Sequence, residues 1–230
     1  MSKRSLRPFQ FVFVLLLVVA TFVAINTQAG NVHAGGWATI TVADLPDHFV
    51  AGQPANLSFT VRQHGVKLMD DLTPSLEAEN GAEKVTASIR KEGTNYHAKF
   101  TLPKPGAWAI TIKSSFGPND ITLLPMQALA ANTKAKHVSD AERGQRLYVA
   151  KGCLQCHQHD GAGVNGRFPW ATNLTSKHYR DAYLAQVLTA PEKALALTKN
   201  SQQMPNLNLK PNEVTALTAF INASKRTETN

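Results

Sequence analysis

The residues with the clearest chemical potential are two cysteines and a histidine in the sequence Cys153-Leu154-Gln155-Cys156-His157. These are the only two cysteines in the 230-residue chain. Two thiols at this spacing can form a redox pair, supply half of a metal site, or each add to a vinyl group of a porphyrin as a thioether. In the last case the adjoining imidazole would lie under the iron as a ligand.

The C-x-x-C-H spacing is the attachment signature of c-type haem, and we favour this interpretation. A thioredoxin-like pair needs a βαβ setting, which the surrounding sequence lacks. A zinc site needs further ligands at short spacing, and His159 alone would not complete one. Two cysteines are too few for an all-cysteine zinc or iron–sulfur site. The motif therefore predicts one covalent haem c, attached to Cys153 and Cys156, with His157 as the proximal iron ligand.

Met204 is the expected distal ligand of that iron. It lies 47 residues after His157 and precedes Pro205, which would stiffen the loop that presents it. Thioether sulfur is a soft ligand that favours ferrous iron. A methionine that only fills the core is the alternative. His178 is the main rival ligand but is expected at a helix start, and His159 is too close to His157 to reach the opposite haem face.

Helical patterns surround the candidate ligands. A capping box that begins at Ser139 predicts a helix over about 139–151. Apolar residues at helical spacing predict a second helix near 179–189 and a last helix over about 211–223. The small side chain of Gly144 would let the first and last helices cross closely.

Residues from about 139 to 226 resemble a small exported mono-haem class I cytochrome c domain. The matching features are Gly144, Leu147-Tyr148, Lys151-Gly152, the C-x-x-C-H motif, Asp160–Gly163, Phe168-Pro169-Trp170, Met204-Pro205 and the last helix. The resemblance implies an all-α fold that binds haem between crossing terminal helices with its edge exposed. It also implies that the Pro169 carbonyl accepts the ring N–H of His157, and that Arg167, Trp170 and Asn173 meet the haem propionates.

The middle third of the chain predicts a different fold. Between residues 35 and 126, short runs of alternating apolar and polar residues are separated by Gly, Pro and Asn, as in antiparallel strands. Six or seven such runs favour an all-β, Ig-like sandwich. The stretch Phe100–Ile112 resembles the YtkA-like or FixH-like group of exported sandwich domains. Scattered His and Met residues are copper-ligand candidates, but a packing, docking or spacer role is the default. The candidates are His33, His48, His64, His97, Met69 and Met126.

The first 34 residues predict an export signal or an N-terminal anchor helix. Lys3, Arg4 and Arg7 precede an apolar run over residues 9–25, followed by small residues that a signal peptidase could cut. The run is short for a membrane span and long for a signal, so both interpretations stay open. Either one exports the rest of the chain to the periplasm or the outer face of the cytoplasmic membrane.

Charge divides the chain in the same way. The leader has three cations and no anions, residues 35–134 have nine of each, and the remainder has twelve cations and seven anions, within a net charge of +8. The expected organisation is a leader (1–34), a β-sandwich domain (35–126), a linker (127–138) and a cytochrome c domain (139–226).

These features predict an electron carrier rather than an enzyme, because two filled axial positions leave the iron no open site. Lysines around the haem edge would steer redox donors and acceptors with acidic docking surfaces. Nucleic acid is not an expected partner of an exported chain. Alternatives are a cytochrome subunit of a membrane redox enzyme complex and, less favoured, a haem sensor or a copper-handling protein.

Overall fold

The computed structural model describes residues 36–117, 119–162, 171–175, 177–195 and 204–223. They all belong to one structural unit, Gly36–Asn230. The expected signal or anchor helix lies outside the described residues. Within the described ranges no helix has the length and apolar character to cross a membrane.

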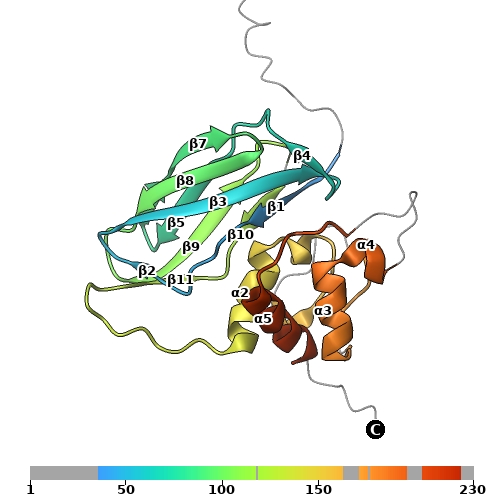
Figure 1. Ribbon diagram of the computed structural model, residues 1–230. Helices are drawn as coiled ribbons and strands as arrows, with labels where there is room; N and C mark the ends of the chain where they lie inside the picture. The colour runs from blue at the N-terminus through green and yellow to red at the C-terminus, as the bar shows by residue number, and fades with distance from the viewer. Residues whose placement is uncertain (1–35, 118, 163–170, 176, 196–203, 224–230) are drawn as a thin grey trace, which may run out of the picture. The chain divides into compact units, whose positions relative to one another are not determined.

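Two β-sheets form the N-terminal part of the described chain (Figure 1). The first has the order β1-β3-β8-β7, with β4 paired to β3: β1 (Ala38–Val42), β3 (Pro54–Gln63), β8 (Asn95–Thr101), β7 (Ser88–Glu92) and β4 (Lys67–Met69). The second has the order β2-β11-β9-β5-β6, with β10 paired to β9: β2 (Phe49–Val50), β11 (Met126–Leu129), β9 (Gly106–Lys113), β5 (Ser75–Asn80), β6 (Glu83–Thr86) and β10 (Asp120–Thr122). The described strand pairs are antiparallel except β2 with β11.

One apolar core lies between the sheets, because alternate residues of their strands point inward. In β3 these are Leu57, Phe59 and Val61, and in β9 they are Trp108, Ile110 and Ile112, all fully buried. Met69 and Met126 are also buried in this core, so they act there as packing residues. The expected N-terminal β-sheet region is therefore confirmed.

Several strands were not expected from the sequence. The short strands β2 and β4 carry too few residues for a readable alternation, and β5 contains Ser, Glu, Ala and Asn in place of β-branched residues. The expected linker also begins too early, since β11 continues to Leu129. Met126 in that strand pairs with Trp108 in β9, so tertiary pairing outweighs its weak local preference.

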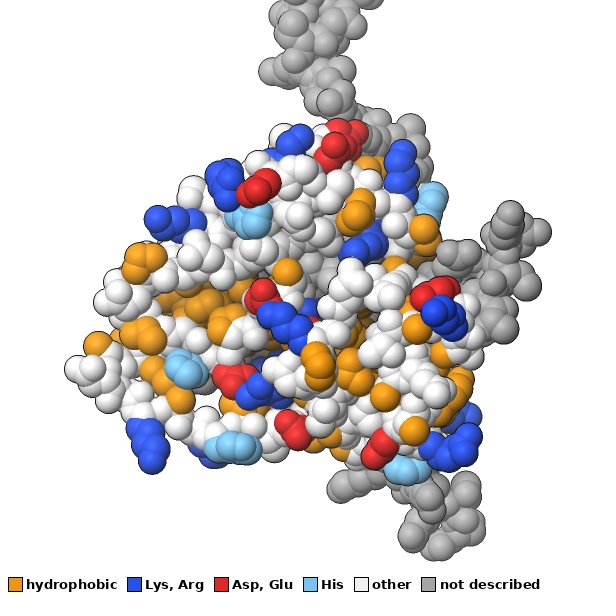
Figure 2. Space-filling view, in the orientation of Figure 1, with side chains coloured by type: hydrophobic (Ala, Val, Ile, Leu, Met, Phe, Trp, Pro, Cys, Tyr) orange, Lys and Arg blue, Asp and Glu red, His pale blue; other side chains and the backbone are white. Residues whose placement is uncertain are grey.

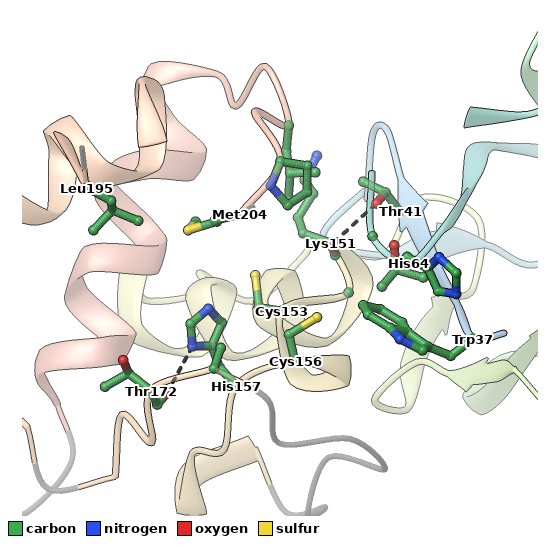
Figure 3. A pocket seen from close by; sticks show the side chains of 16 residues that line it. Trp37, Thr41, His64, Lys151, Cys153, Cys156, His157, Thr172, Leu195 and Met204 are labelled. Carbon is green, nitrogen blue, oxygen red and sulfur yellow. Dashed lines mark hydrogen bonds between the residues drawn. The ribbon is translucent and has the colours of Figure 1, made fainter. Parts of the chain in front are cut away.

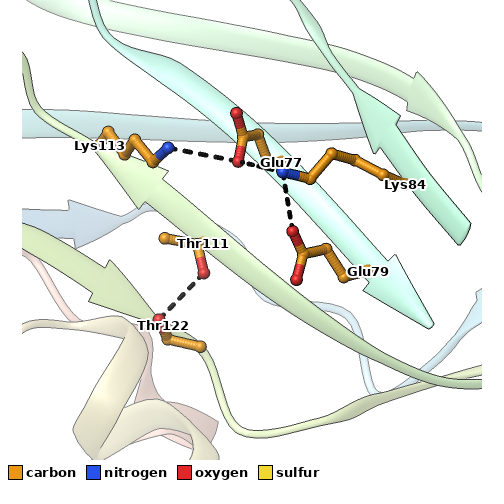
Figure 4. A network of polar contacts seen from close by, with 6 residues as sticks. All are labelled: Glu77, Glu79, Lys84, Thr111, Lys113 and Thr122. Carbon is orange, nitrogen blue, oxygen red and sulfur yellow. Dashed lines mark hydrogen bonds and ion pairs between the residues drawn. The ribbon is translucent and has the colours of Figure 1, made fainter. Parts of the chain in front are cut away.

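The outer face of the second sheet carries cross-strand polar pairs (Figure 4). Lys84 and Lys113, from the strands on either side of β5, both bind the Glu77 carboxylate, at 3.2 and 3.3 Å. Lys84 also pairs with Glu79 at 2.9 Å. Hydrogen bonds from Lys84, and then from Lys113, lower the pKa of Glu77. These exposed pairs keep this face polar and contribute little stability individually.

The C-terminal part is helical, as expected. It contains α2 (Asp140–Ala150), α3 (Asp181–Thr189), α4 (Pro191–Ala194) and α5 (Pro211–Asn222), with short 3₁₀ turns η1 (Cys153–Gln155) and η2 (Asp160–Ala162). The Ser139 hydroxyl accepts the Glu142 N–H at 3.3 Å, so the expected cap is formed. A Cβ on Gly144 would collide with the Ala216 carbonyl and lie 2.7 Å from the Phe220 Cβ. The close crossing of α2 and α5 therefore requires glycine at position 144. Helix α4 was not expected from the sequence.

Strand β1 is buried on both faces, whereas the sequence alternation predicts one exposed face. Thr39 and Thr41 are only 6% and 7% exposed. The Thr41 hydroxyl donates to the Lys151 carbonyl at 3.4 Å, and the Ile40 N–H donates to Gln155 Oε1 at 2.9 Å. The helical part therefore covers the outer face and the free edge of this strand.

A buried ion pair stands beside this contact. Lys151 Nζ lies 2.7 Å from Glu213 Oε1 and donates to the Ala43 carbonyl at 2.5 Å. The two side chains are 3% and 8% exposed. Glu213 Oε2 also accepts the Lys210 N–H at 2.9 Å, which caps the start of α5.

A second set of contacts joins the segment after β1 to the same helices. Asp47 Oδ2 pairs with Arg143 at 2.5 Å, and the Asp47 carbonyl accepts from Arg146 at 2.9 Å. Asp44 pairs with Lys210 at 2.5 Å on the surface. The N-terminal sheet and the helices are thus joined by specific polar contacts as well as by packing.

Replacement of Glu213 by Ala should destabilise the protein by about 3–5 kcal/mol, because it leaves the Lys151 ammonium buried without its carboxylate. Urea unfolding followed by circular dichroism measures this loss. The exposed pair partner Glu79→Ala is the control and should change stability by about 0–1 kcal/mol. Equal effects of the two variants would show that the buried pair has no special weight.

Candidate functional site

The C-x-x-C-H motif begins where α2 ends. Gly152 follows the helix with a φ of +80°, a left-handed conformation that favours glycine. A Cβ on Gly152 would also lie only 2.6 Å from the Ile40 carbonyl oxygen. The chain then enters η1, where the N–H groups of Cys156 and His157 donate to the Cys153 carbonyl at 3.1 and 2.8 Å. This tight turn holds the three side chains of the motif close together.

The His157 ring is held in one orientation. Its Nδ1 lies 2.9 Å from the Thr172 carbonyl oxygen. A carbonyl can only accept, so Nδ1 carries the proton and Nε2 keeps the lone pair that a metal needs. The Tyr148 hydroxyl donates to the His157 carbonyl at 3.2 Å and fixes the backbone beneath. Burial lowers the pKa of His157, which favours the neutral, ligating form.

This ring contact corrects one expectation from the sequence. The Pro169 carbonyl was expected to accept the His157 ring N–H, but the structure gives that place to Thr172. Both residues lie on the segment after the motif, so a resemblance could point to the segment without selecting the carbonyl. Pro169 itself lies outside the described residues.

A cavity of about 410 Å³ contains the expected attachment and ligand residues together. Cys153, Cys156, His157 and Met204 all line it. In Figure 3, Met204 lies above and His157 below, while the cysteines lie toward Trp37. The volume is in the range of binding pockets for sizeable organic ligands.

The donor set of this cavity fits a covalent haem. Two thiols can form thioethers, and an imidazole and a methionine sulfur are an axial pair that haem proteins use. The motif and Met204 come from separate segments, and folding brings them to one space. Most of the surface that lines the cavity is apolar, and Ala171, Leu195 and Leu207 contribute to it.

The two thiols do not have the character of a redox pair. Burial raises the pKa of Cys153 to about 12, with a further contribution from nearby Cys156. Burial also raises the pKa of Cys156. Reactive cysteines need a lowered pKa so that the thiolate is present at neutral pH. These thiols are therefore poorly suited to disulfide exchange.

The rival ligands lie away from the cavity. His178 is exposed, and it does not line the cavity. His159 is 2% exposed, its ring centroid lies 4.3 Å from that of Phe220, and it packs also against Tyr148. Its role in the structure is therefore packing between α2 and α5.

The expected propionate contacts are only partly described. Arg167 and Trp170 lie outside the described residues. Asn173 is exposed; its amide donates to Gln158 Oε1 at 3.1 Å, and it does not line the cavity. The suggested contact of Asn173 with haem is thus not supported by its position.

One side of the cavity was not expected from the sequence. Trp37, Thr39, Thr41, His64 and Gly65 line it, and all of them belong to the N-terminal sheet region. The one local indication of a turn in this region is the His64-Gly65 pair, because glycine is common in turns. Nothing local indicates that this turn faces the cysteine motif.

The crossed helices, the C-x-x-C-H turn and the facing methionine are the features expected of a c-type haem-binding domain. Residues 141–225 match the family model described as Cytochrome c. The C-terminal part of the chain is therefore a cytochrome c domain. The match spans less than half of the chain and assigns the family to this segment alone.

Other comparisons add little. A comparison with curated proteins finds no match. Among solved structures, domains 4 and 5 of the S-layer protein SbsC are 22% identical with a TM-score of 0.33, covering 40% of this chain and 51% of that one. The Lin-41 filamin domain is 11% identical with a TM-score of 0.32, covering 43% and 100%. This chain thus spans about half the length of the SbsC fragment. TM-scores this low do not establish a shared fold.

Replacement of both Cys153 and Cys156 by Ser should abolish covalent haem attachment. Haem-dependent peroxidase staining of a denaturing gel measures this, because only covalently bound haem stays with the denatured chain. Each single replacement leaves one thioether and should retain reduced staining. Met204→Ala is the control and should stain like the unmodified protein. Haem that stays bound to the double variant would contradict the assignment.

Proposed function

We propose that this chain is a c-type cytochrome that carries one covalent haem and transfers one electron at a time outside the cytoplasm. The observation that carries the proposal is the convergence of Cys153, Cys156, His157 and Met204 on one cavity. Bound there, haem would supply an iron that alternates between the ferric and ferrous states. A single C-x-x-C-H motif supports a count of one haem.

The protein residues would have separate roles in this function. The two cysteines would tether the group, so that no deep pocket is needed to retain it. His157, oriented by the Thr172 carbonyl, would present Nε2 to the iron. Met204 would fill the opposite position and favour the reduced state. With both ligands bound, the iron would have no open position for a substrate, which supports an electron carrier rather than an enzyme.

The proposed partners are redox proteins with acidic docking surfaces. The cation excess of the C-terminal part, twelve against seven anions, supports this choice. On the face shown in Figure 2, cationic and anionic side chains are interspersed. On that face, local groups of cations rather than one uniformly basic surface would steer the partner. Export to the periplasm or the outer membrane face is part of the proposal and is supported by the basic, apolar leader.

Replacement of Met204 by Ala tests the axial ligand. The ferric protein should show the weak long-wavelength absorption band expected for methionine–iron ligation in this family, and the variant should lose it. The variant should also have a lower reduction potential, because the soft sulfur ligand stabilises ferrous iron. Absorption spectra of both oxidation states and a redox titration measure these changes.

His178→Ala is the matched control, because His178 is the rival ligand and lies outside the cavity. It should keep the band and the potential. A band that persists in Met204→Ala, or that is lost in His178→Ala, would overturn the axial assignment.

A further inference from the structure

We propose that Trp37 and His64 of the N-terminal sheet region form a wall of the haem pocket and shield the iron from solvent and small ligands. This inference rests on the proposed haem function and extends it, because it makes the pocket a product of both folds. It gives the sheet region a role at the site, where the sequence favoured a packing, docking or spacer role.

The first support is the lining of the cavity. The same space that receives Cys156, His157 and Met204 is bordered by Trp37 and His64. In Figure 3 these two side chains lie on the cysteine side of the cavity, across from Leu195. The helical part does not supply the wall on this side, because Trp37 lies directly before β1 and His64 directly after β3.

The second support is that the wall is a built structure. The Trp37 carbonyl accepts the His64 N–H at 2.8 Å, and the two rings have centroids 5.9 Å apart. His64 and Gly65 both have positive φ, +52° and +73°, in the turn between β3 and β4. A Cβ on Gly65 would lie 3.3 Å from Trp37 Cη2, so the turn packs directly on the indole.

The third support is the attachment of this wall to the haem motif. Strand β1 starts immediately after Trp37, and its Ile40 N–H donates to Gln155, a residue between the two cysteines. The Ile40 carbonyl lies against Gly152. The wall and the attachment turn are thus held in register by the same strand, 115 residues earlier in the chain than Gln155.

The chemical consequence follows from the burial of the site. The burial of a haem and its exposure to solvent affect both its reduction potential and the access of ligands to its iron. Ferric iron carries more charge than ferrous iron, so water near the group favours the ferric state. A closed wall would therefore raise the potential and slow the entry of anions.

Trp37→Ala in the haem-loaded, full-length protein is the direct test. We expect a lower reduction potential by redox titration, seen as a several-fold smaller ferrous-to-ferric ratio at a fixed solution potential. We also expect several-fold faster binding of cyanide to the ferric protein. Trp37→Phe should restore most of both properties, and His64→Ala should shift them in the same direction by less.

Tyr183→Ala is the matched control, since Tyr183 is an exposed aromatic residue of α3 that does not line the cavity. It should change neither property. If Trp37→Ala does not fold, Asp47→Ala carries the test, because it removes the Arg143 pair that helps to hold the sheet region on α2. Its expected shift has the same direction.

Two outcomes separate this inference from the function on which it rests. An unmodified protein without covalent haem would overturn the proposed function. A normal haem protein whose potential and cyanide binding are unchanged in the folded Trp37 variant, or in Asp47→Ala if that variant replaces it, would overturn only the wall.

Discussion

The buried ammonium group of Lys151 is where three distant segments of the chain meet. Lys151 follows the last residue of α2. Its ammonium group pairs with Glu213 at the start of α5 and donates to the Ala43 carbonyl just after β1. A charge in such a place is tolerated only when its donors are satisfied, so all three segments must be present at once. Gly152 and Cys153 follow directly. The position of the C-x-x-C-H turn therefore depends on this ion pair.

The parts of the fold that the sequence predicted well are those with local causes. The Ser139 cap and the apolar stripes placed α2 and α5 within two residues of their observed bounds. Gly144 was expected to permit a close crossing because no other residue is small enough, and its contact with Ala216 agrees. The cysteine motif could be interpreted because its chemistry requires that spacing in the chain itself.

The parts that could not be predicted depend on contacts between remote residues. The alternation in β1 correctly gives one inward face, but nothing in it shows that Thr39 and Thr41 are covered by the helical part. The Thr172 carbonyl is a backbone atom without a side-chain signature, so its contact with His157 is invisible in a sequence. β11 extends into the expected linker because it pairs with β9, which local preference does not reveal.

Strand β1 is the end strand of its sheet, and its only strand partner among the described elements is β3. Exposed end strands offer unpaired N–H and C=O groups to other chains, and natural sheets use charges, proline or a covering element to prevent this. Here the protection is the helical part, through Gln155 and Lys151. The sheet region therefore carries a Thr-Ile-Thr-Val edge that could pair with other chains if it were uncovered, and the helical part protects it against self-association.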